Sequence, residues 1–310
     1  MKIDRVYIAR VFQEALVKGV SRGVLQSEWL KIFNSYFTDY ESINFEYFKQ
    51  LEKMIRLSSS DLSYERDIEK GRRLGLKYLL LGDSGYPSQL IDLLEPPFLL
   101  EVLGDESALL NMGLGIVGSR EPVEESIHWL ESDLRNVLSD YALTVMSGGA
   151  RGIDQVSHRL AFKLNVPTVA VLPSGLGKIY PSNLSDWVAE LEGRKSCFIS
   201  EFSFSQEIRK HFFQQRNRLI PALSIAVIIV EAKEKSGTMI TARLSAEQGK
   251  AVYVVPAHPT HKKFRGNLNL IADGATPIAG VDHLRAFLAE EIVSYNRRHS
   301  IHRLSEQLEH

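Results

Sequence analysis

The chain has little cysteine, no long hydrophobic run and no excess of either charge. Cys197 is the single cysteine among 310 residues, which excludes an internal disulfide and a multi-thiolate zinc site. This cysteine usage is typical of a cytoplasmic protein. The longest apolar stretch, residues 219–230, is interrupted by Pro221 and Ser224 and is too short to span a bilayer. We therefore expect no membrane association, and charged residues near the N-terminus also argue against a signal peptide.

The balance of charge excludes a protein that is basic all over, such as a histone-like DNA binder. Lysine and arginine total 37 against 38 aspartate and glutamate, so the formal net charge is −1. A basic groove confined to one region remains compatible with this balance. The hydrophobic fraction of 44% and the charged fraction of 24% indicate a folded globular protein. At roughly 150 residues per domain, the length suggests about two domains.

Residues 1–75 are predicted to form a small helical N-terminal domain. Val11, Phe12, Ala15 and Leu16 follow helical spacing, and a similar pattern recurs from Leu25 to Phe33. Further helices are predicted near residues 41–57 and 61–74. The aromatic residues indicate a packed core, and no pattern in this region points to chemistry.

From residue 76 to about residue 290, short β-rich runs alternate with amphipathic helical stretches. This pattern predicts an α/β fold with an extended, Rossmann-like, doubly wound and mostly parallel sheet. Residues 291–310 are predicted to form a C-terminal tail, whose last three residues resemble the start of an expression tag. The predicted helices cover 123–138, 153–164 and 238–248. The predicted strands cover 78–81, 115–117, 143–146, 168–172, 197–200, 226–230 and 252–255.

Two glycine-rich loops follow neighbouring predicted strands. In open α/β sheets, ligands bind beyond the carboxyl ends of the strands. The first loop, Gly118-Ser119-Arg120, precedes a helix predicted to begin at Pro122. The second runs from Ser147 through Gly148, Gly149, Ala150 and Arg151 to Gly152. Each loop could serve only to turn the chain, but an arginine in both favours phosphate binding at helix starts.

Neither loop matches a standard nucleotide motif. Gly113, Gly115 and Gly118 have the spacing of the dinucleotide fingerprint, but the first two fall before or within the predicted strand rather than in the strand-to-helix turn. The second loop is not a Walker A loop, because no Gly-Lys-Ser/Thr follows it. No cofactor is therefore predicted.

A basic and aromatic segment lies between Arg194 and Arg218. It contains six basic residues against two acidic ones, interleaved with phenylalanines. Basic grooves with aromatic surfaces are typical of single-stranded nucleic-acid binding, although most individual phenylalanines are expected in the core. A second basic loop contains Lys262, Lys263 and Arg265. Lys235, Ser236, Gly237 and Thr238 lead into another predicted helix, where they could cap the helix or hold phosphate.

The sequence gives only weak evidence for catalytic residues. Ser147, Asp154 and His158 lie close in sequence, but no nucleophile-elbow pattern surrounds Ser147. The histidines show no metal-ligand spacing. We therefore predict a protein that is not an enzyme and that holds no metal.

An ordered series of short motifs resembles the bacterial DNA-processing protein A family (DprA, also called Smf). The resemblance covers about residues 80–280. Its blocks are Tyr86-Pro87, Glu95-Pro96-Pro97, Val117 to Arg120, Ser147 to Asp154, Leu172 to Gly175, Ile179 to Pro181, Phe212-Phe213, Arg216 to Ile220, Val230 to Ala232, Lys235 to Thr238, Val255-Pro256, Gly266-Asn267 and Gly274-Ala275.

The resemblance implies an extended Rossmann fold behind a helical N-terminal domain. It also implies binding of single-stranded DNA, a homodimer, and loading of the recombinase RecA onto DNA during natural transformation. Carried over by position, the DNA site comprises Gly118, Ser119, Arg120, Ser147, Gly148, Gly149, Arg151, Gly152, Arg216, Asn217, Arg218, Lys235, Ser236, Gly237 and Thr238.

Two other functions remain open at this level. One is a nucleotide phosphoribohydrolase of a related Rossmann family, although its Pro-Gly-Gly-x-Gly-Thr motif is missing and residues 231–238 carry Lys235 instead. The other is a regulator that binds a small nucleotide, which the fold permits without specific support.

Overall fold

The computed structural model describes residues 4–17, 20–32 and 63–308. The helix predicted near residues 41–57 lies outside these ranges. Among the helices in the described part of the chain, none has the length and apolar character needed to span a bilayer.

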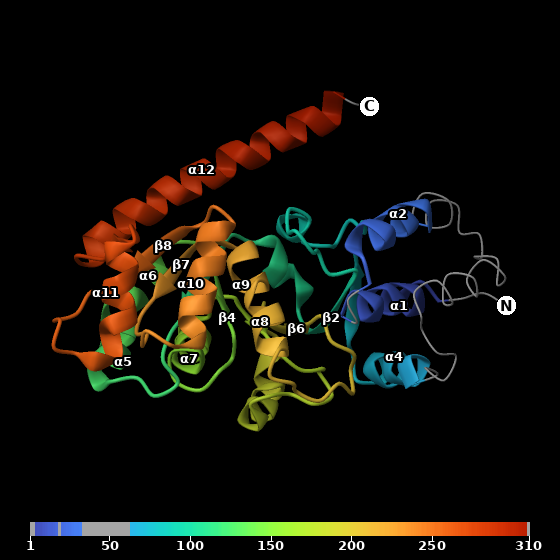
Figure 1. Ribbon diagram of the computed structural model, residues 1–310, viewed down its shortest axis with the longest axis horizontal. Coiled ribbons are helices and arrows are strands. Elements are labelled where there is room, and N and C mark those ends of the chain that lie inside the picture. The colour runs from blue at the N-terminus through green and yellow to red at the C-terminus, as the bar shows by residue number, and fades with distance from the viewer. Residues whose placement is uncertain (1–3, 18–19, 33–62, 309–310) are drawn as a thin grey trace.

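A single mixed sheet organises the molecule (Figure 1). Its order is β1-β2-β6-β5-β4-β3-β7-β8-β9. Neighbouring strands from β6 to β9 in this order are parallel, whereas β1 and β2 are antiparallel to their neighbours. The strands are β1 (Lys77–Leu80), β2 (Leu99–Gly104), β3 (Gly113–Val117), β4 (Thr144–Ser147), β5 (Thr168–Val171), β6 (Cys197–Ser200), β7 (Ser224–Ile229), β8 (Ala251–Val254) and β9 (Thr276–Pro277).

The predicted doubly wound α/β class is confirmed. All seven predicted strands are present within a residue or two of their expected bounds, and β2 and β9 are additional. Both faces of the sheet are buried, which explains the near-continuous apolar runs. In β7, Ile228 packs on one face and Ile229 on the other.

Helices cover the two faces of the sheet. On the Ile228 face lie α5 (Glu124–Trp129), a π-helical segment (Leu130–Leu134), α6 (Arg135–Asp140), α7 (Ile153–Leu164) and the start of α12 (Val281–Leu308). On the other face lie α9 (Leu219–Ala222), α10 (Gly237–Glu247) and α11 (Arg265–Ala272), with α8 (Phe212–Asn217) beside α9 (Figure 1). Short 3-10 turns occupy Ser88–Leu90, Glu106–Leu110, Ser182–Trp187, Ala189–Leu191 and Lys262–Phe264.

The N-terminal helices gather beside β2 at one end of the molecule (Figure 1). The described ones are α1 (Arg5–Val17), α2 (Arg22–Ile32) and α4 (Ser63–Arg73). Phe12, Trp29 and Phe98 form an aromatic cluster with ring centroids 5.3–5.4 Å apart. The same cluster includes Leu80 and Leu99 of the sheet. The helical region therefore shares its core with the sheet edge.

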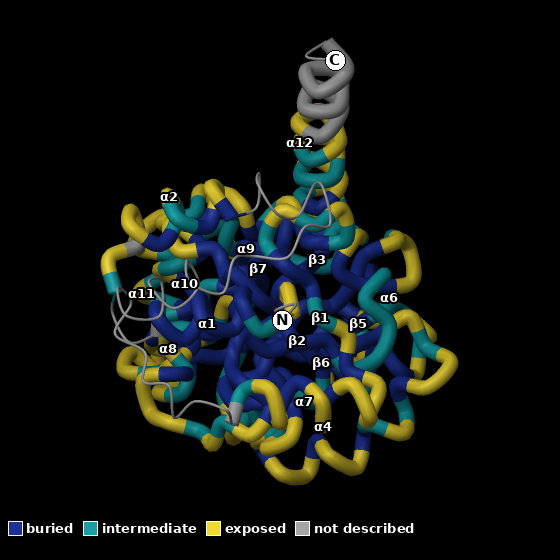
Figure 2. The backbone as a smooth tube through the Cα atoms, turned by 90° about the vertical axis from the view of Figure 1, so that its right-hand side faces the viewer, coloured by how far each residue is buried: buried dark blue, intermediate teal, exposed yellow. Residues whose placement is uncertain are grey.

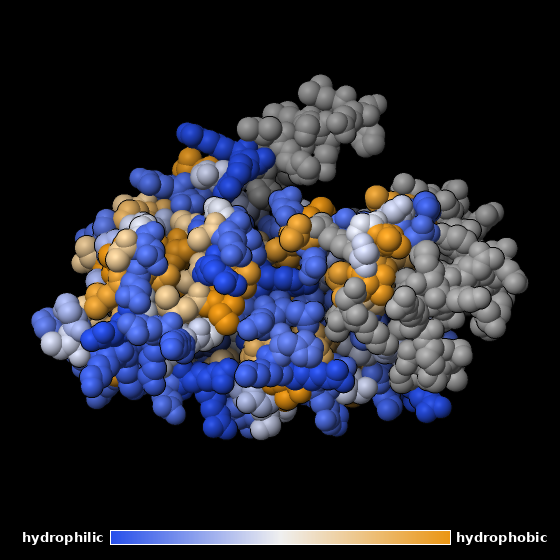
Figure 3. All heavy atoms as spheres, in the orientation of Figure 1, coloured by the Kyte–Doolittle hydropathy of each residue, from blue (hydrophilic) through white to orange (hydrophobic). Residues whose placement is uncertain are grey.

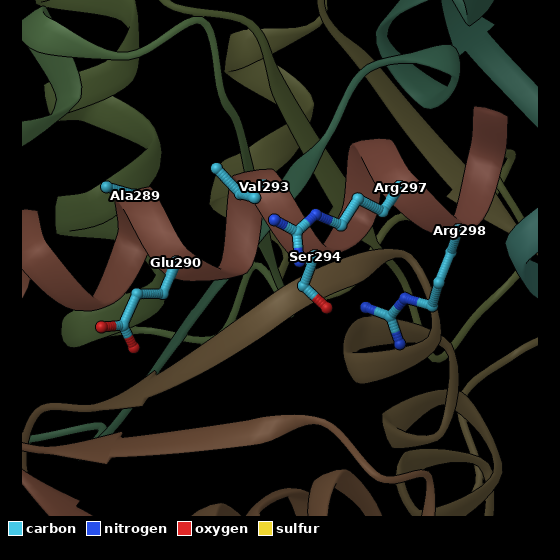
Figure 4. A pocket seen from close by; sticks show the side chains of 6 residues that line it. All are labelled: Ala289, Glu290, Val293, Ser294, Arg297 and Arg298. Carbon is cyan, nitrogen blue, oxygen red and sulfur yellow. The ribbon is translucent and has the colours of Figure 1, made fainter.

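Helix α12 contains most of the segment predicted as a C-terminal tail from residue 291. The helix runs without a break from Val281 to Leu308, and Leu284 and Leu288 anchor its first turns in the core. Beyond the core it projects from the body (Figures 1 and 2). An open cavity of about 520 Å³ runs along it (Figure 4), lined by Ala289, Glu290, Val293, Ser294, Arg297 and Arg298. No residue of the predicted DNA site lines this cavity.

The strand order reverses direction beside β3. From β3 the chain proceeds through β4, β5 and β6 toward one edge, and then through β7, β8 and β9 toward the other. The carboxyl ends of β3 and β7 therefore flank the topological switch point, where ligands bind in open α/β sheets. The Gly118 and Glu231 loops begin at these two strand ends.

Candidate nucleic-acid interface

The loop after β3 leaves Arg120 exposed at the switch point. Ser119 holds the turn, because its hydroxyl accepts the amide hydrogen of Glu121 at 3.2 Å and its carbonyl accepts that of Ile153 at 3.0 Å. A side chain at Gly118 would place its Cβ 2.6 Å from the side chain of Ile153. The loop thus packs tightly on α7, while the Arg120 guanidinium stays exposed.

The start of α5 is not an open phosphate site, which corrects the sequence prediction. The helix begins at Glu124 rather than at Pro122. The buried carboxylate of Glu231 accepts hydrogen bonds from the Val123 amide and the Ser126 hydroxyl, both at 2.8 Å. The position expected for an external anion is therefore occupied by the protein's own carboxylate.

Amides of the second glycine loop also form hydrogen bonds with a side chain of the protein itself. Asp154 accepts hydrogen bonds from the amides of Gly148 at 3.1 Å and Ala150 at 3.3 Å. Gly149 and Gly152 have φ values of 67° and 79°, which favour glycine. Two of the loop amides that were predicted to cradle phosphate therefore bind this side chain.

The polar side chains flanking that loop differ in exposure. Ser147 is buried and its hydroxyl donates to the Ile116 carbonyl at 2.6 Å. Arg151 is exposed. Of the predicted residues in this loop, Arg151 alone presents a charged side chain to a ligand.

Arg216 lies beneath the second loop rather than on the surface. Its side chain is buried and donates to the carbonyls of Gly148 and Val171. Burial lowers the pKa of Arg216 to about 10 and raises the pKa of Asp154 to about 6, and their opposite charges partly offset both shifts. The Arg216 guanidinium is thus occupied by backbone acceptors and is not exposed to a ligand in this structure.

The two residues after Arg216 also have limited exposure. Asn217 is buried. The Arg218 guanidinium forms a two-pronged ion pair with buried Glu201, at 3.2 and 2.7 Å. Asn217 thus offers no exposed group, and the partly exposed Arg218 already has a carboxylate partner.

The start of α10 lies across the switch point from the first loop. The Thr238 hydroxyl donates to the Gly118 carbonyl at 3.1 Å, and Ser236 donates to the Lys233 carbonyl at 2.9 Å. No side chain caps the first turn of α10, and Lys235 and Gly237 are exposed. The structure therefore brings these two predicted segments together, with an uncapped helix start that suits an anion.

An exposed arginine and two aromatic rings form a platform at this site. The Arg120 guanidinium lies 5.2 Å from the centre of the Phe213 ring. The Tyr180 ring meets Phe213 edge-on, with centroids 6.0 Å apart at 86°. Tyr180 is 40% exposed and Phe213 is partly exposed. We call Arg120, Phe213 and Tyr180 the platform.

Sequence reasoning did not select either ring of the platform as a site residue. Phe202, Phe204 and Phe212 are buried, as expected for most phenylalanines. Phe213 follows Phe212 directly but contacts Arg120 and Tyr180 instead. The exposed face carrying α8 and α10 is largely hydrophilic along its lower half, with small hydrophobic patches between (Figure 3). The available signal was the position of Phe213 in the basic segment 194–218 and of Tyr180 in the loop after β5, two residues after Lys178.

The segments that meet around the platform carry exposed cations. Arg151 follows β4, Lys178 precedes Tyr180, and Lys235 precedes α10. Arg209 and Lys210 lead into α8 and are also exposed. Lys178 lies 3.9 Å from Glu207. The other four cations can neutralise phosphates while the rings stack on bases.

The three candidate catalytic side chains do not form a triad. Ser147 and Asp154 bind backbone groups, as described above. His158 is buried and its Nδ1 lies 2.7 Å from the Thr168 hydroxyl oxygen. Because that hydroxyl donates to the Val145 carbonyl at 2.9 Å, Nδ1 must carry the proton and donate to Thr168. Within the described ranges, no group of three or more His, Cys, Asp or Glu residues could hold a metal ion.

We expect His158 to make stability depend on pH. Burial lowers its pKa from 6.5 to about 3. Below about pH 6.5 the unfolded chain therefore binds a proton at His158, whereas the folded protein does not. The free energy of unfolding consequently decreases as pH falls. Between pH 7 and pH 5, wild type should lose about 2 kcal/mol more unfolding free energy than His158→Gln. Urea denaturation at both pH values measures this difference, and equal losses would contradict it.

The glycines of the false dinucleotide fingerprint have a packing role. Gly113 and Gly115 lie within β3. A Cβ at Gly115 would lie 2.9 Å from the Val227 side chain, and one at Gly113 would meet the Leu223 carbonyl. Both allow β3 to pack closely against β7 and the segment before it.

Comparison with known proteins identifies the family of this chain. Residues 77–289 match the family model of DNA recombination-mediator protein A. Protein Smf of Synechocystis sp. is 32% identical over 244 residues, which cover 77% of this chain and 61% of that protein. The DNA processing protein DprA of Bacillus subtilis is 33% identical over 227 residues, covering 72% and 75% of the two chains. The chain thus spans about three fifths of the Synechocystis protein's length.

Two solved structures share the architecture. DNA processing protein A from Streptococcus pneumoniae superposes with a TM-score of 0.73 at 24% identity, covering 92% of this chain and 98% of that one. DNA processing protein A from Helicobacter pylori, whose structure concerns its single-stranded DNA binding mode, gives a TM-score of 0.62 at 28% identity, covering 69% and 97%. The fold and the matched region together place this chain in the DNA recombination-mediator protein A family.

Proposed function

We propose that this protein binds single-stranded DNA at the platform, with bases on Phe213 and Tyr180 and phosphates on Arg120 and the surrounding cations. The observation that carries the proposal is the exposed cation–aromatic contact between Arg120 and Phe213 at the topological switch point. Within the described residues, Arg120 has no carboxylate at ion-pair distance. Its charge is therefore available to a ligand.

The form of the platform favours single strands over duplex. Aromatic side chains stack on bases only where the base faces are exposed, as in a single strand. Every base has such a face, so little sequence preference is expected. The single-stranded DNA binding mode named for the Helicobacter pylori relative supports the same substrate class.

We expect labelled single-stranded oligonucleotides to bind more tightly than duplexes of the same sequence. Affinity should fall with salt, with a log–log slope of about −0.7 per phosphate neutralised. Fluorescence anisotropy at several salt concentrations measures both quantities. Equal affinity for duplex DNA, or an affinity that salt leaves unchanged, would contradict the proposal.

We further propose that the protein acts as a homodimer that loads RecA onto the bound strand during natural transformation. Membership of the recombination-mediator family supports this partner. Sedimentation at micromolar concentration and RecA filament formation on strands coated with a single-strand-binding protein test the two parts. A monomer that fails to help RecA displace the coating protein would contradict them.

Binding without catalysis is the final part of the proposal. Ser147, Asp154 and His158 are each engaged with different partners, which supports this reading. DNA and nucleoside monophosphates incubated with the protein and Mg²⁺ should remain intact. Product formation that Asp154→Ala abolishes would instead favour a hydrolase.

A further inference from the structure

A buried polar contact joins the first helix to the loop after β6. Gln13 of α1 is fully buried, and its side-chain amide donates to Glu201 Oε2 at 3.2 Å. Its carbonyl oxygen accepts the Phe98 amide hydrogen at 2.8 Å. Gln13 thus bridges the sheet edge and the loop that starts at Glu201.

Arg10 reinforces the same connection one helical turn earlier. Its side chain is 1% exposed and donates to the Glu201 carbonyl at 3.0 Å. It also pairs with Glu101 of β2 at 2.6 Å and lies 3.8 Å from Glu14. Two buried side chains of α1 therefore hold Glu201 by both its carbonyl and its carboxylate.

Glu201 and the adjacent Phe202 contact the two ends of α8. The Glu201 carboxylate holds the Arg218 guanidinium, and Arg218 directly follows Asn217, the last residue of α8. The adjacent Phe202 stacks on Phe212, the first residue of α8, with ring centroids 4.1 Å apart and planes at 26°. Phe212 and Arg218 bracket the helix that carries Phe213.

Helix α8 depends on such external contacts. It contains six residues, too few for a helix to be stable alone. No side chain caps its N-terminus. The buried contacts through Glu201 and Phe202 therefore help to determine where Phe213 lies relative to Arg120 and Tyr180.

We propose that Gln13 is a positioning residue of the DNA site: through Glu201 it fixes α8 and so aligns the Phe213 ring of the platform. This inference rests on the proposed function. It gives the N-terminal helical region a role in DNA binding although Gln13 itself is buried. Arg218 binds the same carboxylate and so also fixes α8.

The test uses Gln13→Met, which keeps the length of the side chain and removes its hydrogen bonds. We expect single-strand affinity to fall about five-fold, within the range for a weakened base stack. The salt slope should stay unchanged, because the phosphate-binding cations remain in place. Quenching of 2-aminopurine in the bound oligonucleotide should decrease, because this signal reports stacking on the platform.

Phe12→Leu is the matched control. Phe12 is buried in the same helix but packs on Trp29 and Phe98 rather than on Glu201. Its substitution should lower the melting temperature and leave affinity and quenching unchanged. Equal losses of affinity in both variants, or none in Gln13→Met, would overturn the inference. If Gln13→Met fails to fold, Arg218→Lys tests the same carboxylate from α8, with the same expected results.

A double variant separates this inference from the proposed function. Phe213→Ala alone should weaken binding about tenfold. Adding Gln13→Met to Phe213→Ala should have no further effect, because the aligned ring is already gone. Additive losses would overturn the positioning role. Wild-type affinity in Phe213→Ala would overturn the proposed DNA site itself.

Discussion

Arg120→Glu is expected to weaken single-stranded DNA binding by about 10- to 100-fold. A charge-assisted hydrogen bond contributes about 1.5–3 kcal/mol, and about 1.4 kcal/mol corresponds to a factor of ten. The glutamate adds repulsion toward phosphate and loses the contact with the Phe213 ring, which lies 5.2 Å from the native guanidinium. Titration of a labelled oligonucleotide at constant salt measures the loss.

The melting temperature should change little in this variant. Arg120 is exposed, and exposed substitutions of this kind usually change stability by less than about 0.5 kcal/mol. Lys163→Glu is a matched control, since Lys163 lies in the last turn of α7, at the opposite end of that helix from the glycine loop. Unchanged affinity in Arg120→Glu, or an equal loss in the control, would show that the DNA lies elsewhere.

The edge of the sheet that carries these loops could be predicted from the sequence, because alternating β and α elements predict parallel strands. Buried apolar runs predicted the parallel strands, and the carboxyl ends of parallel strands share one edge. This placed Gly118 and Thr238 at the same edge, where a hydrogen bond of 3.1 Å joins them. The same pattern placed Gly113 and Gly115 before or within a strand rather than in the turn after it, and both lie within β3.

Strand β2 could not be predicted because its charged residue has a distant partner. Glu101 interrupts the apolar run, yet it is buried. Arg10, 91 residues earlier, supplies the compensating charge at 2.6 Å. Burial raises the pKa of Glu101 to about 7, which shows how strongly the site disfavours an isolated carboxylate. Local pattern carries no information about such pairs.

The roles of the arginines could not be separated from sequence because each resembles a phosphate ligand. Arg120 reaches solvent, whereas Arg216 is buried beneath the second loop and Arg218 binds Glu201. The difference arises from tertiary packing, which decides where each guanidinium finds an acceptor. Sequence could not show either that Asp154 binds the amides of Gly148 and Ala150 in the second loop.

Arg216→Met is the second substitution with a large expected effect, and this effect is on stability. The variant leaves the carbonyls of Gly148 and Val171 without the donor that satisfies them. It also leaves the buried carboxyl of Asp154 without its positive neighbour. Each buried acceptor left without its donor costs about 1–3 kcal/mol, so we expect a loss on the order of 3 kcal/mol of unfolding free energy. Urea denaturation at pH 7 measures this loss.

The double variant Arg216→Met, Asp154→Asn distinguishes a buried support from a ligand contact. With the carboxylate gone, no uncompensated buried charge remains, so the double variant should lose less unfolding free energy than the sum of the single variants. At temperatures where Arg216→Met is folded, its DNA affinity should fall far less than that of Arg120→Glu, because Arg216 is 4% exposed. A stability loss below about 1 kcal/mol together with a loss of affinity like that of Arg120→Glu would instead make Arg216 a direct contact. The two arginines therefore affect different properties of one site. Substitution of Arg120 should change DNA affinity, and substitution of Arg216 should change the free energy of unfolding.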